Sequence, residues 1–301
     1  MQILLALFPD FMLIVLGGLL RRSISADGWK GIDKLNFQIL FPALIFTSAL
    51  SQAPAADDVL VIGFGVWLIM GLGLALAWFV RPLGPERFLD FAGLWQTAWR
   101  FNTALAFVAV QALPDNYRAL MSIAIGMAVP VANILAIGAL SRGQSLSFAK
   151  TLKQIATNPF FIASVAGMGV SISQVSLSPH LLEPVKMLSR AAIPVALLSI
   201  GAALNWQAFA RFNGFSAALN AIKLLILPAA TFAAATSLGI DPARTTVLTL
   251  FAALPTASAA HVLASVFGAD RESVATMIAQ STLIGCLSLP LWLIFLSHVA
   301  A

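Results

Sequence analysis

Three polar residues stand close together within a long apolar stretch, QTAWRFNTALAF, which runs from position 96 to 107. They are Arg100, Asn102 and Thr103, and they supply a permanent cation, an amide and a hydroxyl. Such a set is suited to binding a carboxylate, because the guanidinium group donates two parallel hydrogen bonds to it. The alternative is structural, with Arg100 bonded to carbonyl groups at the end of a neighbouring helix.

A second polar group surrounds a proline in AALPTASAAHVLA, residues 252–264. In a helix interior Pro255 removes one backbone hydrogen bond. Thr256 and Ser258 stand beside the backbone groups that this would free, where a substrate or an ion could bind. The alternative is a simple kink whose hydroxyls bond their own helix. His261 follows six residues after the proline and is a candidate for carrying a coupling proton, since histidine titrates near neutral pH, although a packing role is the alternative.

Five further polar residues lie in apolar segments. Asn133 either lines a site or bonds to a neighbouring helix. Gln280, Ser281 and Thr282 form a polar run that either couples an ion or bonds its own backbone. Lys223 is expected to extend its amine to the headgroup region of the bilayer, and a functional role is the alternative.

The amino-acid composition indicates what kind of protein positions these residues. Of 301 residues, 60% are hydrophobic and 10% charged, and the mean hydropathy is +0.93. Soluble domains carry about 25% charged residues, so the sequence predicts an all-α integral membrane protein. The net charge of +5 then reflects membrane topology, and no nucleic-acid partner is predicted. The lone Cys286 and the lack of paired acids, an HExxH motif or a nucleophile elbow predict no metal, no cofactor and no enzymatic activity.

Ten apolar segments are long enough to be transmembrane helices, each needing roughly 20 residues. They are 3–20, 35–51, 59–80, 89–112, 118–140, 158–173, 185–204, 213–237, 243–267 and 273–298. The first is expected to be retained, because no basic residue precedes it and no cleavage pattern follows it.

The loop charges predict the orientation. Eleven basic residues fall in one alternating set of loops and four in the other, which places the first set in the cytoplasm and both termini outside, in the cell (inner) membrane. The first set is Arg21, Arg22, Lys30, Lys34, Arg81, Arg87, Arg142, Lys150, Lys153, Arg211 and Arg271, and the second is Arg118, Lys186, Arg190 and Arg244.

The two halves of the chain resemble each other. Prolines recur in the same order, pairing Pro9 with Pro159, Pro42 with Pro194, and Pro130 with Pro290. Each half has five segments, an odd number, so the second half enters the membrane with opposite orientation, as in secondary transporters built from inverted repeats. The expected division is 1–141 for the first repeat, 142–157 for a cytoplasmic linker and 158–301 for the second repeat.

The same repeat aligns Asn102 with Pro255. The fourth and ninth helices are therefore expected to break at matching places and to bind substrate near the membrane midplane. An arginine in mid-membrane costs about 2.5–3.5 kcal/mol and usually faces a partner or a cavity. No acidic residue lies within reach in the sequence, so Arg100 is expected to be satisfied by helix-end carbonyls, by water or by a bound anion.

The sequence resembles the auxin efflux carrier family over nearly its whole length. The resemblance rests on LNFQILFPALIF (35–46), WRFNTALAF (99–107), VPVANILAI (129–137), NPFFIASVAG (158–167), AAIPVALLSIGAAL (191–204), IKLLILP (222–228) and LPTASAAHVLA (254–264).

This resemblance implies two inverted five-helix repeats with the fourth and ninth helices broken and crossing. It also implies a scaffold of helices 1, 2, 6 and 7, a mobile part of helices 3–5 and 8–10, elevator-type alternating access and a homodimer. Asn102, Pro255 and Thr256 match the family's crossover, and Asn158 matches the opening of the sixth helix. Family members often carry an asparagine after the second crossover proline, where this sequence has alanines, so its ion or substrate can differ.

The expected function is transport of small organic anions, either mono- or dicarboxylates of the malonate, malate or auxin type, bound at the crossing of helices 4 and 9. One alternative is a sodium-coupled symporter of a more apolar anion. Another is a receptor or scaffold with the same fold that transports nothing. The coupling ion, sodium or a proton, stays open, as does the substrate.

Overall fold

The computed structural model describes residues 12–51, 56–111, 113–140, 157, 159–173, 175, 177–203, 210–257 and 259–299. Within these ranges the chain is helical and contains no strand. Five of the described helical stretches are long and apolar enough to cross a membrane: Ala56–Phe79, Asn116–Leu140, Pro179–Ala202, Gly214–Ser237 and Arg271–His298. The described part of the chain is therefore all-helical, and its long apolar helices are those of an integral membrane protein, as the composition predicted.

A helix over residues 12–20 precedes the labelled elements. These are, in chain order, α2 (Ala26–Leu35), η1 (Asn36–Leu40), α3 (Phe41–Ser51), α4 (Ala56–Phe79), η2 (Arg81–Leu83), α5 (Phe88–Trp95), η3 (Gln96–Ala98), α6 (Thr103–Gln111), α7 (Asp115–Leu140), α9 (Pro159–Ile172), α10 (Pro179–Ala203), α11 (Gly214–Ala221), η5 (Ile222–Ile226), α12 (Leu227–Ser237), α13 (Pro242–Ala253), α14 (Ala259–Phe267) and α15 (Arg271–Val299). The elements η1 and η5 are π-helical turns inside longer helices.

Each of the ten predicted segments contains helical residues, but two of the helices begin more than three residues earlier than predicted. The helix expected from residue 35 begins at Ala26, because the Ser25 hydroxyl oxygen accepts a hydrogen bond from the Gly28 N–H at 3.1 Å. The helix expected from residue 185 begins at Pro179, a residue type favoured at the first helical position. Both extensions are more polar than the segments they precede, which hid them from a hydropathy criterion.

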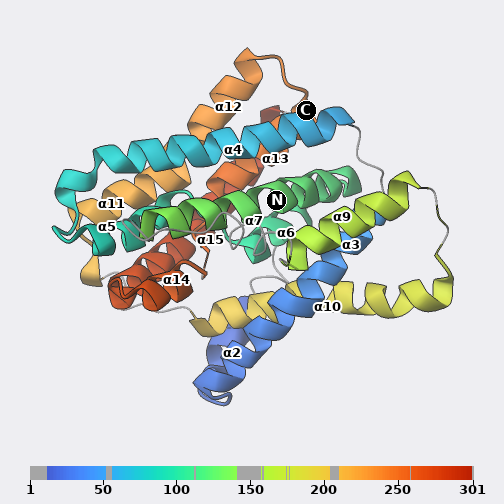
Figure 1. Ribbon diagram of the computed structural model, residues 1–301, viewed down its shortest axis with the longest axis horizontal. Coiled ribbons are helices and arrows are strands. Elements are labelled where there is room, and N and C mark those ends of the chain that lie inside the picture. Colours follow the sequence, from blue (N-terminus) through green and yellow to red (C-terminus); the bar gives the residue numbers. More distant parts are fainter. Residues whose placement is uncertain are drawn as a thin grey trace.

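The helices pack as two groups with α7 between them (Figure 1). On one side α3 packs against α9 and α10. On the other side α4 packs against α13, and α12 also packs against α13. Helix α7 contacts α4 and α13 in one group and α3 and α9 in the other.

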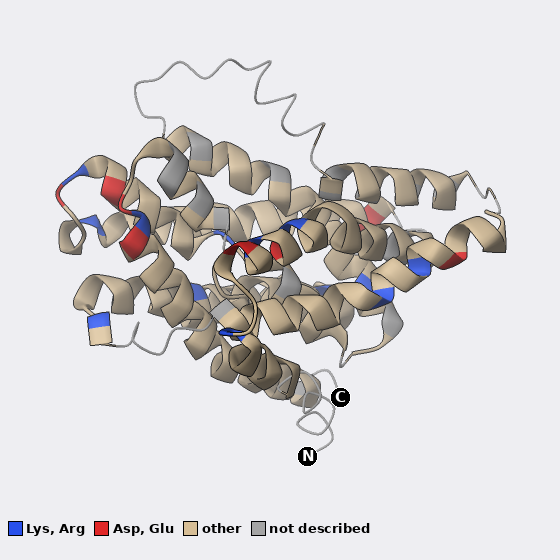
Figure 2. Cartoon of the chain, turned by 90° about the horizontal axis from the view of Figure 1, so that it is seen from below, with Lys and Arg blue, Asp and Glu red and all other residues tan. Residues whose placement is uncertain are grey.

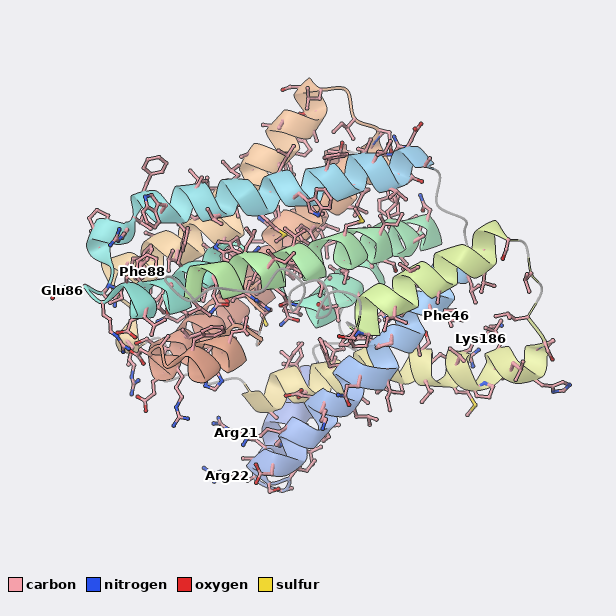
Figure 3. The ribbon with its side chains drawn as sticks, viewed as in Figure 1. Arg21, Arg22, Phe46, Glu86, Phe88 and Lys186 are labelled. Carbon is pink, nitrogen blue, oxygen red and sulfur yellow. The ribbon has the colours of Figure 1, made fainter. Side chains whose placement is uncertain are left out.

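Charged residues are sparse along the helices and collect near their ends. Figure 2 shows long helical runs with neither acidic nor basic residues. Figure 3 places Glu86 and Phe88 at the turn between α4 and α5, and Arg21 and Arg22 beside the start of α2. Near that turn the Arg81 guanidinium lies over the Trp78 ring at 5.1 Å, a cation–π contact at a helix end.

The prediction that Lys223 extends to the membrane surface is wrong. Its side chain is 2% exposed and lies in η5, in the middle of the continuous helix formed by α11, η5 and α12. Lysine can reach a headgroup only from near a helix end, and this residue is about nine residues from the start of α11 at Gly214, roughly 13 Å at 1.5 Å per residue. Tertiary packing on all sides encloses it instead.

Candidate functional site

The fourth predicted segment is broken in the structure. Helix α5 ends in the 3-10 turn η3, residues 99–102 are not helical, and α6 begins at Thr103. Asn102 caps the new helix: its side-chain oxygen accepts the Leu105 N–H at 3.3 Å and its carbonyl accepts the Ala106 N–H at 3.0 Å. Asparagine is among the best N-cap residues, so Asn102, which the sequence predicts to be a substrate ligand, also starts α6.

The ninth predicted segment is broken as well. Helix α13 ends at Ala253, residues 254–257 are extended or irregular, and α14 runs from Ala259. Leu254 has φ −63° and ψ 136°, the extended conformation that a following proline imposes on the residue before it. The Pro255 ring therefore explains this break from the sequence alone.

Four interactions hold the two breaks against each other. The Asn102 N–H donates to the Pro255 carbonyl at 2.8 Å, and the Thr256 hydroxyl donates to the Thr97 carbonyl at 2.6 Å. The Gln96 side-chain amide donates to the Ala260 carbonyl at 3.2 Å. The Phe101 and Phe251 rings lie 4.5 Å apart between centroids. The positions that the repeat aligned, 102 and 255, are thus in direct contact.

Arg100 is buried beside this contact, with 4% of its side chain exposed. Its Nη2 donates to Oδ1 of Asn133 at 3.0 Å, while Nε and Nη1 have no hydrogen-bond partner. Among the described residues no carboxylate forms an ion pair with it. A buried ion without a partner costs several kcal/mol. The guanidinium is therefore held by one amide and retains unused donors.

The bond to Arg100 also orients Asn133. Because Oδ1 of Asn133 accepts from the guanidinium, its NH2 group, on the opposite edge of the planar amide, points away from Arg100. Asn133, Asn102 and Thr103 are all partly exposed, whereas Arg100 and Thr256 are buried. The exposed side of the cluster therefore consists of polar side chains, and the buried guanidinium of Arg100 lies beneath them.

Two helices begin at the crossing. Helices α6 and α14 each have nine residues and each begins immediately after a break. The first turn of a helix carries unbonded N–H groups and about half a positive charge. With the buried cation, these termini make the crossing electropositive without an exposed charged side chain.

The other predicted site residues have different surroundings. The Ser281 hydroxyl accepts the Thr256 N–H at 3.2 Å and donates to the Ile278 carbonyl, and Thr282 donates to that carbonyl at 2.8 Å. Ser281 therefore ties α15 to the crossing, whereas Thr282 bonds only the backbone of its own helix. Gln280 is fully buried on the same helix, and His261 is partly exposed on α14. Asn158 and Ser258 lie outside the described residues.

Sequence reasoning missed three residues that build the crossing. Gln96 and Thr97 provide contacts described above, and Gly285 of α15 makes room for the Pro255 ring. A methyl group on Gly285 would lie 2.1 Å from Cγ of Pro255. The glycine falls in an apolar helix with nothing in its neighbourhood to mark it, so only the tertiary structure identifies its role.

Substituting Gly285 by alanine is expected to destabilise the protein by about 1–3 kcal/mol, the usual cost of overpacking a rigid site. The proline ring cannot rotate out of the way. The measurement is the Tm of the purified protein in detergent. Gly71→Ala on α4 is the control, because a methyl group there meets nothing within 4 Å. Equal Tm values for the two variants would show that α15 and the crossing are further apart than in the structure.

Comparisons with known proteins identify a family for this chain. A family model described as a membrane transport protein matches residues 143–293, which is half of the chain. An uncharacterized transporter of Methanothermobacter thermautotrophicus is 34% identical over 110 residues, and the match covers 36% of this chain and 36% of that protein. The chain therefore spans only about a third of the length of that curated relative. On the strength of the family match, the chain belongs to the membrane transport protein family, that of the auxin efflux carriers.

Proposed function

We propose that the protein is a secondary transporter of small organic anions that binds a carboxylate at the crossing of α5–α6 with α13–α14. One observation carries the proposal: the buried Arg100 lies at this crossing with unused donors and with no acidic partner among the described residues. An anion that arrives and leaves would satisfy that charge only while it is bound. Membership of a transport family supports the proposal that this anion is a cargo.

The proposed binding mode follows from which groups are exposed. The carboxylate would accept hydrogen bonds from the amide NH2 of Asn133, from Thr103 and from the N–H groups that open α6 and α14. Arg100 would contribute from behind, through its charge and through its bond to Asn133. Thr256, Pro255, Ser281 and Gln96 would keep the two breaks in register and would make no contact with the substrate.

The proposed transport mechanism is an elevator. The ten segments would form two inverted repeats, with a scaffold made from the helix at 12–20, α2–α3, α9 and α10, and a mobile part made from the remaining helices. The packing supports this division, because α3 contacts α9 and α10 while α4 contacts α13, with α7 between the two parts. A homodimer in the cell (inner) membrane, joined through its scaffolds and with both termini outside the cytoplasm, is part of the same proposal.

The test is exchange of labelled carboxylates by the purified protein in liposomes. Vesicles loaded with unlabelled malonate, malate or a monocarboxylate are placed in the labelled compound, and uptake is expected above that of protein-free vesicles. Uptake that requires sodium would favour the sodium-coupled alternative. No exchange and no ligand-dependent rise in Tm with any of these anions would contradict the proposal and favour a receptor or scaffold.

A further inference from the structure

A second buried basic residue lies in the same group of helices and takes no part in the proposed anion site. Lys223 is 2% exposed and stands in η5, the π-helical turn Ile222–Ile226. Within the described part of the chain it makes no ion pair and no side-chain hydrogen bond. A lysine so placed needs either a counter-ion or the neutral, deprotonated form of its amine.

The turn that holds Lys223 is fixed from two sides. Pro228 has no N–H, so the carbonyl of Leu224, four residues earlier, loses its usual helical partner. The indole N–H of Trp292 on α15 donates to that carbonyl at 3.0 Å. Single π-turns inside α-helices occur frequently at functional sites, and this one is stabilised by a proline and a tryptophan.

Polar atoms without partners lie on the elements around this turn. Asn220, three residues before Lys223 and so on the same helix face, is 4% exposed, and its Oδ1 accepts no hydrogen bond. On α15 the hydroxyl of Ser288, one turn before Trp292, is also buried without a partner. The Asn220 NH2 group is occupied by the Ser216 carbonyl at 2.9 Å. The neighbourhood therefore offers oxygen acceptors and no negative charge.

Lys223 also lies close to the crossing. Gly73 of α4 lies between the two. A methyl group on it would meet Cδ1 of Leu227, four residues after Lys223, at 3.0 Å and Cβ of Trp99, in the first break, at 3.1 Å. The turn η5 packs against η3 and α15. The amine and the guanidinium of Arg100 thus occupy the same low-dielectric group of helices, where like charges repel strongly.

The other ionisable groups on the elements packed against η5 are not placed to neutralise the amine. These elements are α4, α11, α12, α13, α15 and η3. Their described ionisable residues are Asp57 and Asp58 in the first turn of α4, Arg244 in the first turn of α13, Arg271 and Glu272 at the start of α15, His298 in its last turn, and the Cys286 thiol within α15. Asp58 pairs with Arg244 at 2.8 Å, and Glu272 lies 4.0 Å from Arg211.

We propose that the amine of Lys223 is a proton-binding site that couples anion transport to protons. The amine is neutral while the anion site is empty. When an anion cancels the charge of Arg100, the nitrogen lone pair of Lys223 takes a proton from the aqueous phase and becomes an ammonium. Release of anion and proton on the other side restores the amine. The coupling is reciprocal, so protonation in turn strengthens anion binding.

This inference rests on the proposed anion site, and the experiment separates the two. Proteoliposomes containing the wild type and the Lys223→Met variant are loaded with a pH-sensitive dye, and malonate, malate or a monocarboxylate is added outside. Wild-type vesicles are expected to accumulate the labelled anion when the outside is more acidic, with acidification of the lumen. Lys223→Met is expected to exchange anion for anion at equal pH and to lose both the accumulation and the acidification.

Two further variants sharpen the comparison. Lys186→Met removes an exposed lysine on α10 (Figure 3) and is expected to behave as the wild type. His261→Ala tests the other ionisable residue near the crossing and is also expected to keep the coupling. Proton-driven accumulation that survives in Lys223→Met, or that is lost only in His261→Ala, would overturn the proposal. A wild type that exchanges anions without responding to pH would overturn it while leaving the proposed function intact.

A measurement without substrate covers the case in which no tested anion is transported. The unfolded chain carries Lys223 protonated at neutral pH, whereas the folded protein is proposed to hold it neutral. The unfolded state then binds one more proton, so folding stability rises with pH. The Tm of the wild type relative to Lys223→Met is therefore expected to rise from neutral pH up to about pH 10, the ordinary pKa of a lysine amine. Parallel Tm curves would show an amine that stays protonated, and the proposal would be wrong.

Discussion

Arg100→Met is expected to weaken anion exchange by about 10–100-fold, measured as the apparent affinity for the labelled carboxylate. A hydrogen bond to a charged group contributes about 1.5–3 kcal/mol, and every 1.4 kcal/mol is a factor of ten. The variant loses the cation behind the site and the bond that orients Asn133. Arg100→Lys keeps a charge but loses the planar donor geometry, so its affinity is expected to lie between the two.

Asn133→Asp separates loss of function from loss of fold. The new carboxylate would form an ion pair with Arg100 across the present 3.0 Å contact. The folded protein is expected to keep its Tm, while the partly exposed negative charge repels the substrate and exchange stops. If Asn133→Asp and Arg100→Met both exchange anions with wild-type affinity, the crossing does not bind the carboxylate.

A double-mutant cycle distinguishes two ways in which Arg100 can act. If it acts by orienting Asn133, then removing both side chains, in Arg100→Met with Asn133→Leu, costs less than the sum of the single substitutions. If Arg100 contacts the anion independently, the two costs add. We expect a non-additive result, because Arg100 is 4% exposed and its observed partner is Asn133.

The two helix breaks at the crossing differ in how well the sequence predicts them. Pro255 forces the second break by local chemistry, so it can be recognised in isolation. The first break has neither glycine nor proline near it and depends on contacts with the second, such as the Thr256 hydroxyl on the Thr97 carbonyl. Its local signal is the N-cap asparagine, Asn102, which sequence reasoning assessed as a ligand and not as a cap. Partnerships across helices, such as Arg100 with Asn133, have no spacing rule and require the fold.

Burial of Lys223 was missed for a related reason. In the sequence, Lys223 lies among leucines and isoleucines, a pattern that predicts a charged side chain extending to the membrane surface. Whether it escapes depends on its depth in the bilayer and on which helices surround it, and neither is encoded by its neighbours. The pair Leu224 and Pro228 does indicate a freed carbonyl at this point, but its partner Trp292 lies 68 residues further along the chain.

Gly17→Ala and Gly201→Ala are each expected to prevent folding of the protein. The helix at residues 12–20 crosses α10 with the backbones in contact: a methyl group on Gly17 would lie 2.0 Å from the Leu198 carbonyl oxygen, and one on Gly201 would lie 1.9 Å from that of Ile14. Small residues let transmembrane helices approach this closely. Neither contact involves a side chain that can rotate away, so the helices would have to separate.

The cost of that separation is expected to exceed about 4–5 kcal/mol, a large share of the roughly 5–15 kcal/mol that stabilises a typical protein. The measurement is the yield of monodisperse protein after detergent extraction, together with its Tm. Gly18→Ala is a matched control one residue away, since its methyl group would meet the Gly201 carbonyl oxygen at 3.6 Å, an ordinary contact. Because this crossing lies within the proposed scaffold, separating the two helices would remove the surface against which the mobile helices slide. A Gly17→Ala protein that purifies like Gly18→Ala would place the two helices further apart and would leave the proposed scaffold without its tightest contact.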